Sequence, residues 1–269
     1  MPNEHFLATA LKAADAGARE IMRYRKSFKV SVKGRNDLVT NADVASQQAI
    51  QQIISSTFPD HLFVGEELGA SHEAELAKIA DGYVWIVDPL DGTANYVHGL
   101  QGYAVSIALC QQGIPLVGVV LDPVSGERFH AVRGCGAFLG EQKLTHSGCG
   151  SIADAMIACS FPPAVKRNSP DVIRFGFVLE KAQSMRRLGS AALNLCYVAS
   201  GRLDAYWATC VNAWDIAAGF LIVNEAGGSI RNLDGGDADL WNPKFIAAAS
   251  ESLNYQIAET IRAADEGIG

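Results

Sequence analysis

The sequence contains no run of about twenty apolar residues, the length that a membrane-spanning helix requires. Its apolar stretches are short and carry glycine. In the amino-terminal segment, apolar residues recur in alternating steps of four and three, at Leu7, Leu11, Ala14, Ala18 and Ile21. This spacing predicts an amphipathic helix and not a signal peptide. We therefore expect a soluble, cytoplasmic protein with no membrane partner.

Basic residues are few and scattered. The chain has 22 Lys and Arg against 29 Asp and Glu, a formal net charge of −7, and no run of Lys or Arg. This balance argues against a general nucleic-acid or anionic-membrane surface, although it leaves room for local basic patches. The acidic residues therefore have to be considered one by one.

The six cysteines form no C-x-x-C pair. Most of them lie in apolar, strand-like or helix-like surroundings, so we expect reduced, buried thiols and no structural zinc site. They stand at positions 110, 135, 149, 159, 196 and 210.

Several catalytic and nucleotide-binding motifs are absent. The chain has no G-x-x-x-x-G-K-[ST] loop, no G-x-S-x-G elbow, no H-E-x-x-H helix and no G-x-G-x-x-G after a strand, and its six histidines have no ligand spacing. These absences argue against a P-loop NTPase, a serine hydrolase of the elbow type, a zinc metalloprotease and a dinucleotide-binding enzyme.

Helix-like and strand-like segments are mixed along the first half of the 269 residues, of which nearly half are hydrophobic, enough for a sizeable core. The second helix should be capped by Asn41 or Asp43. Three apolar stretches separated by turn residues predict an antiparallel meander. The expected elements are helices at 7–21, 41–57 and 73–79, and strands within 29–40, at 62–64, at 83–87, and at 104–110, 116–121 and 128–132 in the meander.

Beyond Thr145 the strand-like and helix-like segments alternate. We place a soft boundary near residue 146, between an α+β half (1–145) and an α/β half (146–269). No internal repeat or low-complexity linker separates the halves, so we expect one compact body. The expected elements of the second half include helices at 191–199 and 216–225 and a late strand at 246–249.

Acidic residues stand where apolar runs end. A strand or helix stops at each of these places, so the side chains can converge on one point. Carboxylates packed together repel one another, and some protonate unless hard cations with oxygen ligands hold them. Mg2+ is the natural candidate. The acids are Asp43, Glu66 with Glu67, Asp88 with Asp91, and Asp215.

The segment after the strand at 83–87 predicts an anion site. Pro89 and Gly92 suit a tight turn. The following residues are typical of a helix start, with Asp91 in the capping position and the backbone N–H groups of Gly92 and Thr93 free to bind an anion. Metal ions on phosphate oxygens, amides that hold the same phosphate, and a hydroxyl beside a carboxylate are the parts needed for in-line attack of water on phosphorus.

Three long motifs follow one another along the chain: Gly65–Glu67, Trp85–Gly99 and Trp214–Gly228. Weaker ones lie at Asp37–Asp43 and Gly189–Asn194. At these residues the chain resembles the inositol monophosphatase family, part of the lithium-sensitive, metal-dependent sugar phosphatases. The resemblance spans nearly the whole chain in the family's order. It implies a layered αβαβα sandwich of mixed α+β and α/β character, usually a homodimer.

The resemblance also implies a set of metal ligands. Glu66, Asp88 and the backbone carbonyl of Leu90 would hold one Mg2+. Asp88, Asp91 and Asp215 would hold a second ion, and a third, weaker ion would lie near Glu66. Two to three ions would thus serve one active site.

Further roles carried over from the family concern the water and the substrate. Thr93 and Asp43, together with Glu66, would form the catalytic group, in which Thr93 and Asp43 orient and help deprotonate the water. The amides of Gly92 and Thr93 would hold the phosphate. The residues expected to contact a small phosphomonoester are Asp91, Gly92, Thr93, Gly189, Ser190, Ala191, Ala208 and Asp215.

One position departs from the family pattern. Members that act on inositol phosphate carry a glutamate six residues before the Trp-Asp pair, where it binds ring hydroxyls, and this chain has Ala208 there. Losing that acceptor removes sugar recognition without touching the metal ligands. Inositol 1-phosphate is our first choice of substrate. Histidinol phosphate, another sugar phosphate or a nucleotide-derived phosphate are the alternatives.

Other interpretations remain open at this stage. A regulatory binding protein on the same fold is one, since some bacterial relatives associate with the transcription machinery and fold alone does not set function. The presence of every expected metal ligand favours the enzyme, and both roles can coexist. A phosphatase for bisphosphates ranks third, because no concentrated basic pocket for a second phosphate is evident. Asp43 could serve only as a helix cap and Glu67 only as a supporting residue.

Overall fold

The computed structural model describes residues 2–34, 37–68, 82–162 and 164–267. Its helices are α1 (Pro2–Tyr24), α2 (Asn41–Thr57), α4 (Thr93–His98), α5 (Pro170–Lys181), α6 (Ala191–Ala199), α7 (Ala213–Glu225) and α8 (Glu251–Glu266), with 3-10 turns η1 (Glu66–Leu68) and η3 (Ile152–Asp154). Its strands are β1 (Val30–Gly34), β2 (Asp37–Thr40), β3 (Leu62–Gly65), β4 (Tyr83–Asp91), β5 (Ala104–Gln111), β6 (Ile114–Leu121), β7 (Arg128–Val132), β8 (Gly136–Leu139), β9 (Gln142–Lys143), β10 (Met156–Ser160), β11 (Ser184–Arg186), β12 (Ala205–Ala208), β13 (Ser229–Asn232) and β14 (Phe245–Ala248).

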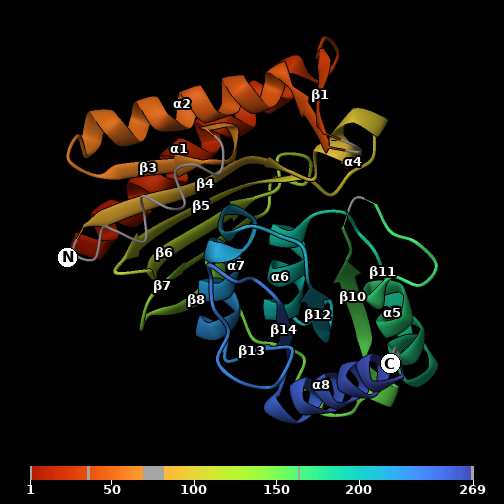
Figure 1. The fold of residues 1–269 in the computed structure, drawn as a ribbon. Helices are drawn as coiled ribbons and strands as arrows, with labels where there is room; N and C mark the ends of the chain where they lie inside the picture. Colours follow the sequence, from red (N-terminus) through yellow and green to blue (C-terminus); the bar gives the residue numbers. More distant parts are fainter. Residues whose placement is uncertain (1, 35–36, 69–81, 163, 268–269) are drawn as a thin grey trace.

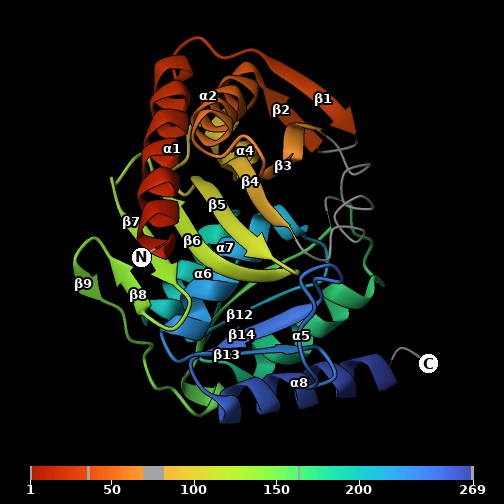
Figure 2. The same cartoon turned by 90° about the vertical axis from the view of Figure 1, so that its left-hand side faces the viewer.

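Helices and sheets alternate in five layers (Figure 1). Helices α1 and α2 cover one face of a seven-stranded sheet, and α6 and α7 lie between this sheet and a five-stranded one. Helices α5 and α8 cover the far face of the second sheet, as the turned view also shows (Figure 2). The predicted αβαβα sandwich is confirmed.

The seven-stranded sheet has the order β3-β4-β5-β6-β7-β8-β9. Only β3 and β4 pair in parallel, and the remaining neighbours are antiparallel. The predicted meander is therefore confirmed as β5, β6 and β7. The short helix predicted at 73–79 lies outside the described residues.

The five-stranded sheet has the order β11-β10-β12-β14-β13. Strand β10 pairs in parallel with β11 and β12, whereas β14 is antiparallel to both of its neighbours. The carboxyl ends of β10 and β12 thus meet at one edge, and β12 ends shortly before α7 begins. The predicted helices at 191–199 and 216–225 and the late strand are present, with α7 beginning three residues earlier, at Ala213.

Three apolar clusters join the layers. One lies between the first helical layer and the seven-stranded sheet, one between the two sheets around α6 and α7, and one between the five-stranded sheet and the outer helices. Neighbouring strand residues alternate between clusters, so Trp85 packs in the first and Ile86 in the second. A sheet buried on both faces needs continuous apolar runs. The central cluster contains residues from both 1–145 and 146–269, and the division of the chain at residue 146 stays a prediction.

The prediction that the cysteines are buried was partly wrong. All six thiols are free, and Cys110, Cys159 and Cys196 are buried. Cys135 and Cys210 are exposed, because they lie in the β7–β8 turn and in the loop before α7 and not inside regular elements.

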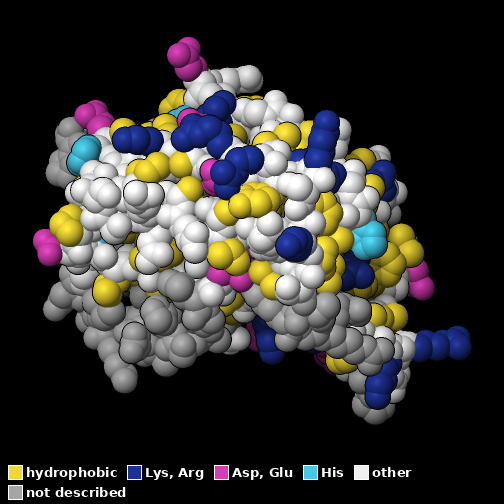
Figure 3. Space-filling view, turned by 90° about the horizontal axis from the view of Figure 1, so that it is seen from above, with side chains coloured by type: hydrophobic (Ala, Val, Ile, Leu, Met, Phe, Trp, Pro, Cys, Tyr) yellow, Lys and Arg dark blue, Asp and Glu magenta, His cyan; other side chains and the backbone are white. Residues whose placement is uncertain are grey.

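Two surface properties agree with the composition. No helix among the described residues is long and apolar enough to cross a membrane. On the face seen in Figure 3, Lys and Arg side chains lie in small groups between hydrophobic and uncharged ones. That face therefore offers no broad basic surface for a polyanion.

Candidate active site

Asp88 and Asp91 lie within β4 itself, and not in the tight turn predicted after it. Asp88 pairs with Ser106 and Asp91 with Ala104, so β4 has one residue more than β5 over this stretch. In a regular strand, residues three apart point to opposite faces, and the extra residue of a bulge brings them to the same face. Pro89 lies inside the bulge, where its missing N–H costs no ladder bond. The bulge thus aims two carboxylates at one point.

Asp215, in the first turn of α7, completes a cluster with these two residues. Asp88, Asp91 and Asp215 each place a carboxylate oxygen within 4.8 Å of the others. Asp88 is 2% and Asp91 8% exposed, and Asp215 is half-buried. Burial raises the pKa of Asp88 well above its usual range, and the charges of Glu66, Asp91 and Asp215 raise it further. A bound cation would relieve this repulsion.

The carboxylate of Asp91 is held by the start of α6. It accepts hydrogen bonds from Ser190 Oγ at 2.5 Å, from the amide of Ala192 at 2.7 Å and from that of Ala191 at 3.3 Å. Burial raises the pKa of Asp91 to about 6, and these bonds oppose the rise. Asp91 was predicted to cap α4, and this prediction was wrong. The bulge turns the Asp91 side chain toward α6, and Gly92 takes the cap position.

Two glycines allow the backbone segments of the site to approach closely. Gly92 has φ +91°, and a Cβ there would lie 2.9 Å from the carbonyl oxygen of Gly102. Gly189 has φ +94°, and a Cβ there would lie 2.8 Å from the side-chain nitrogen Nδ2 of Asn95. The same Asn95 nitrogen donates to the carbonyls of Gly102 and Leu188, both at 2.8 Å. Asn95 thus ties α4 to the segment that leads into α6.

Asp43 serves both as a helix-capping group and as a partner of Thr93. The N-cap residue of α2 is Thr40, not the predicted Asn41 or Asp43, and Asp43 completes its capping box. Asp43 Oδ2 accepts from the Thr40 amide at 2.9 Å and from the Thr40 hydroxyl at 2.5 Å. Asp43 Oδ1 lies 3.1 Å from Thr93 Oγ1, which is also 2.9 Å from the carbonyl oxygen of Leu90. Burial raises the pKa of Asp43 to about 6, against the effect of the Thr40 bonds.

The two glutamates of η1 occupy different surroundings. Of the neighbouring charges that raise the pKa of Asp88, the charge of Glu66 has the largest effect, so Glu66 lies near the carboxylate cluster. Glu67 lies near Asp43, whose pKa its charge also raises. The amide of Glu67 donates to Gln47 Oε1 at 3.1 Å, which fixes η1 against α2.

The position that departs from the family pattern is fully buried. Ala208 ends β12 and pairs with Ser160 of β10 and Phe245 of β14. Tyr206 lies on the same face of β12, because side chains two apart share a face. Its hydroxyl donates to Ser160 Oγ at 2.8 Å. The contacts of Gly189 and Ala208 with a substrate stay predictions.

Some residues of the site escaped the sequence analysis. Thr40 donates to Asp43, and Gln47 accepts from the Glu67 amide in η1. The amide of Ala192 donates to Asp91. A threonine three residues before an acid is the spacing of a capping box, which points to Thr40. The other two contacts join segments distant in the chain, and no local pattern predicts them.

Comparison with known proteins agrees with this geometry. The model of the inositol monophosphatase family matches residues 2–266. A Nus factor SuhB of Pasteurella multocida is 41% identical, covering 90% of this chain and 89% of its own length, and an inositol-1-monophosphatase of Caulobacter vibrioides is 37% identical over 96% of this chain and 100% of its own. The crystal structure of an extragenic suppressor protein suhB from Bartonella henselae superimposes with a TM-score of 0.86 at 33% identity, over 96% of this chain and 98% of that one. This chain therefore belongs to the inositol monophosphatase family.

Proposed function

We propose that this protein hydrolyses a small phosphomonoester with water, using divalent cations held by the Asp88, Asp91 and Asp215 cluster. The observation that carries the proposal is the convergence of three carboxylates within 4.8 Å, two of them buried. Burial and the charges of Glu66, Asp91 and Asp215 raise the pKa of Asp88. A bound cation would favour the ionised form of such a group.

The donor set fits Mg2+. Carboxylate and carbonyl oxygens are the ligands that this hard cation prefers. Glu66, Asp88 and the carbonyl of Leu90 would hold one ion, Asp88, Asp91 and Asp215 a second, and Glu66 a weaker third. When bound, the ions supply charge that polarises the phosphate and makes water more acidic.

Thr93 and Asp43 would receive the proton of the attacking water. Thr93 Oγ1 has one hydrogen and two acceptors in reach, Asp43 Oδ1 at 3.1 Å and the Leu90 carbonyl at 2.9 Å. When the hydroxyl donates to Asp43, its oxygen lone pairs are free to accept from the attacking water. The proton of the water then passes to Thr93 Oγ1 while the Thr93 proton passes to Asp43. Asp43, with a pKa of about 6, is mostly ionised at pH 7 and can accept it.

The start of α4 supplies hydrogen-bond donors for the phosphate. Amides in the first turn of a helix have no acceptor within that helix. The positive φ of Gly92 turns the chain directly after Asp91, so the amides of Gly92 and Thr93 follow the cluster that would hold the cations. A phosphate placed there would meet N–H donors and cations together.

The organic part of the substrate would meet no carboxylate from position 208. Ala208 is fully buried, and the hydroxyl of Ser160 beside it already accepts from Tyr206. Inositol 1-phosphate is the first substrate that we propose, since relatives at 37% identity are named inositol-1-monophosphatases. Histidinol phosphate and other phosphomonoesters are the alternatives that the missing carboxylate permits.

Phosphate release tests the proposal. Inositol 1-phosphate, histidinol phosphate, fructose 1,6-bisphosphate and adenosine 3′,5′-bisphosphate are assayed with Mg2+ or with EDTA. We expect release that needs Mg2+ and that falls at least about a hundredfold in Asp88→Asn. Asp154→Asn, an exposed acid in η3, is the matched control and should retain full activity. Release in EDTA, or equal rates in Asp88→Asn and wild type, would count against the proposal.

A regulatory role is the second candidate, because relatives named Nus factor SuhB are 41% and 42% identical to this chain. A binding role does not require the carboxylate cluster to be lost, so both functions can coexist. If no compound of the panel is hydrolysed, this role takes first place.

A further inference from the structure

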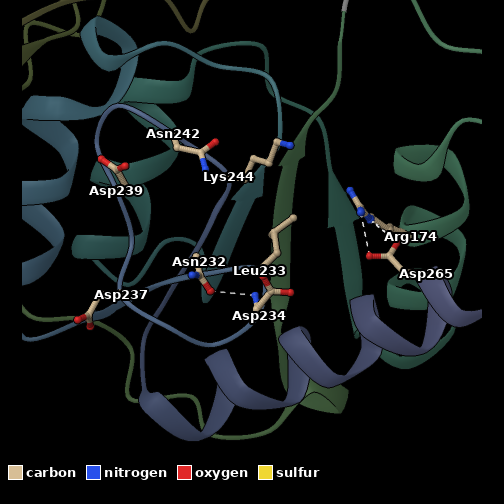
Figure 4. A pocket seen from close by; sticks show the side chains of 9 residues that line it. All are labelled: Arg174, Asn232, Leu233, Asp234, Asp237, Asp239, Asn242, Lys244 and Asp265. Carbon is tan, nitrogen blue, oxygen red and sulfur yellow. Dashed lines mark hydrogen bonds and ion pairs between the residues drawn. The ribbon is translucent and has the colours of Figure 1, made fainter. Parts of the chain in front are cut away.

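A partly buried polar contact ties the loop before α7 to helix α5. Thr209 Oγ1 donates to Asp171 Oδ1 at 2.7 Å. Asp171 is 7% exposed and lies in the first turn of α5, where the positive end of the helix favours a carboxylate. Arg174 reaches the same oxygen at 3.4 Å but makes its two short bonds, 2.7 and 2.8 Å, to Asp265 of α8 (Figure 4). Thr209 is therefore the closest partner of Asp171.

The loop concerned, residues 209–212, joins the five-stranded sheet to the helix that carries Asp215. Its first end is fixed by the pairing of Ala208 within the sheet. At its other end, the amide of Asn212 donates to Asp215 Oδ2 at 2.6 Å. Among the described contacts of residues 209–211, the bond of Thr209 is the only one made by a side-chain hydrogen-bonding group. A shift of the loop would therefore pass directly to the Asp215 carboxylate.

Cys210 follows Thr209 directly in this loop and is exposed. Burial raises the pKa of its thiol, and the charges of Asp171 and Asp215 raise it further. Its thiol is a natural reporter of how the loop is held.

We propose that Thr209 and Asp171 are positioning residues for Asp215, and that their hydrogen bond sets the affinity of the carboxylate cluster for its cation. This inference rests on the proposed function. Without the Thr209 hydroxyl, Asp171 keeps only the 3.4 Å contact with Arg174, and the side chains of residues 209–211 hold the loop only through the packing of Val211 against the central cluster. The Asp215 carboxylate would then occupy less often the position in which its oxygen lies within 4.8 Å of those of Asp88 and Asp91.

Calorimetric titration with Mg2+ tests the inference on wild type, Thr209→Val and Thr209→Ser. Valine keeps the shape of threonine without the hydroxyl, and serine keeps the hydroxyl. We expect Thr209→Val to weaken Mg2+ binding about five- to tenfold and Thr209→Ser to remain within about twofold of wild type. The thermal midpoints of the two variants in EDTA should stay close, which separates positioning from general destabilisation.

The possible outcomes are distinct. Equal Mg2+ affinity in Thr209→Val and wild type, or equal weakening in both variants, would overturn the inference and leave the proposed function standing. A wild type that binds no Mg2+ would overturn the proposed function and this inference with it.

Alkylation by iodoacetamide gives a second measurement that needs no metal. In EDTA, Thr209→Val should label Cys210 at least about threefold faster than wild type, since the loop opens more often. Cys135, exposed in the β7–β8 turn, is the internal control and should label at an unchanged rate. An unchanged ratio of Cys210 to Cys135 labelling would contradict the anchoring role.

Discussion

Asp88 and Asp215 come from different layers of the molecule, one from β4 of the seven-stranded sheet and one from the first turn of α7, yet their carboxylate oxygens lie within 4.8 Å. The β4 bulge directs Asp88, and the capping contact with Asn212 directs Asp215. Two negative groups at this distance in a buried site are costly unless a cation lies between them. The fold thus holds two carboxylates that repel each other, and a bound cation would attract both.

Asp88→Asn should stabilise the metal-free protein. An acid whose folded pKa lies above its unfolded pKa gives stability that is present at low pH and lost as the pH rises through the folded pKa. At pH 8 in EDTA, we expect the variant to gain about 1–3 kcal/mol in free energy of unfolding, and less at pH 5. Urea unfolding measures this, with Asp154→Asn as the unchanged control. A less stable Asp88→Asn at pH 8 would show that the cluster is not under strain.

Binding of Mg2+ should tighten as the pH rises from 5 to 7. Burial raises the pKa of Asp91 and of Asp43 to about 6, so both are largely protonated at pH 5 and ionised at pH 7. Protons compete with the cation for Asp91, so affinity should rise by about tenfold over this range. Calorimetry at three pH values measures it. Affinity that does not change with pH would contradict the role of Asp91 as a ligand.

Thr93→Val should lower kcat by about a hundredfold while leaving Mg2+ affinity within about twofold of wild type. The hydroxyl bridges the water and Asp43, and valine offers no oxygen to receive the proton. Thr93→Ser, which keeps the oxygen, is the matched control. The test is kcat at saturating Mg2+ and substrate, and a Thr93→Val enzyme as fast as Thr93→Ser would exclude the relay.

Ser190→Ala should weaken both helix α6 and the metal site. Ser190 Oγ caps α6 by accepting from the amide of Leu193 at 3.1 Å, and it donates to Asp91 at 2.5 Å. We expect a loss of about 1 kcal/mol in free energy of unfolding and about tenfold weaker Mg2+ binding. Ser190→Thr retains the hydroxyl and serves as the control. Unchanged Mg2+ binding in the alanine variant would show that the Asp91 bond does not matter for the site.

Ala208→Glu should improve hydrolysis of inositol 1-phosphate. Ala208 is fully buried, so the longer glutamate side chain has to extend from the end of β12 toward the site to offer substrate hydroxyls an acceptor. With the carboxylate there, we expect kcat/KM to rise about tenfold. Ala208→Gln has the same size without the charge and should gain less. The ratio of kcat/KM for inositol 1-phosphate to that for histidinol phosphate is the measurement. A ratio that stays constant across the three proteins would remove position 208 from substrate recognition.

Local patterns in the sequence predicted most of the regular elements. Apolar periodicity identified α1, the meander and the buried strands, because each element has to bury a face of its own. The position of Asp88 and Asp91 was misjudged since Pro89 suggested a turn, whereas the strand absorbs it in a bulge and continues to Asp91. A bulge depends on the partner strand, which a single segment does not reveal.

For the candidate site, the sequence predicted the acidic residues but not the contacts that hold them in place. The acids Asp88, Asp91 and Asp215 stood at the ends of predicted elements, and the structure brings them together. The contacts that hold them in place, such as those of Asp91 with α6 and of Thr209 with Asp171, join segments far apart in the chain. Such contacts follow from the packing of the layers and not from spacing along the sequence.

The most direct test of the central claim is the anomalous scattering of a Mn2+-soaked crystal, with Mn2+ standing for Mg2+. The account predicts at least one strong peak in contact with carboxylate oxygens of Asp88, Asp91 and Asp215, and its loss in crystals of Asp88→Asn. A peak-free cluster in the wild type, with the three carboxylates hydrogen-bonded only to one another and to the protein, would contradict it.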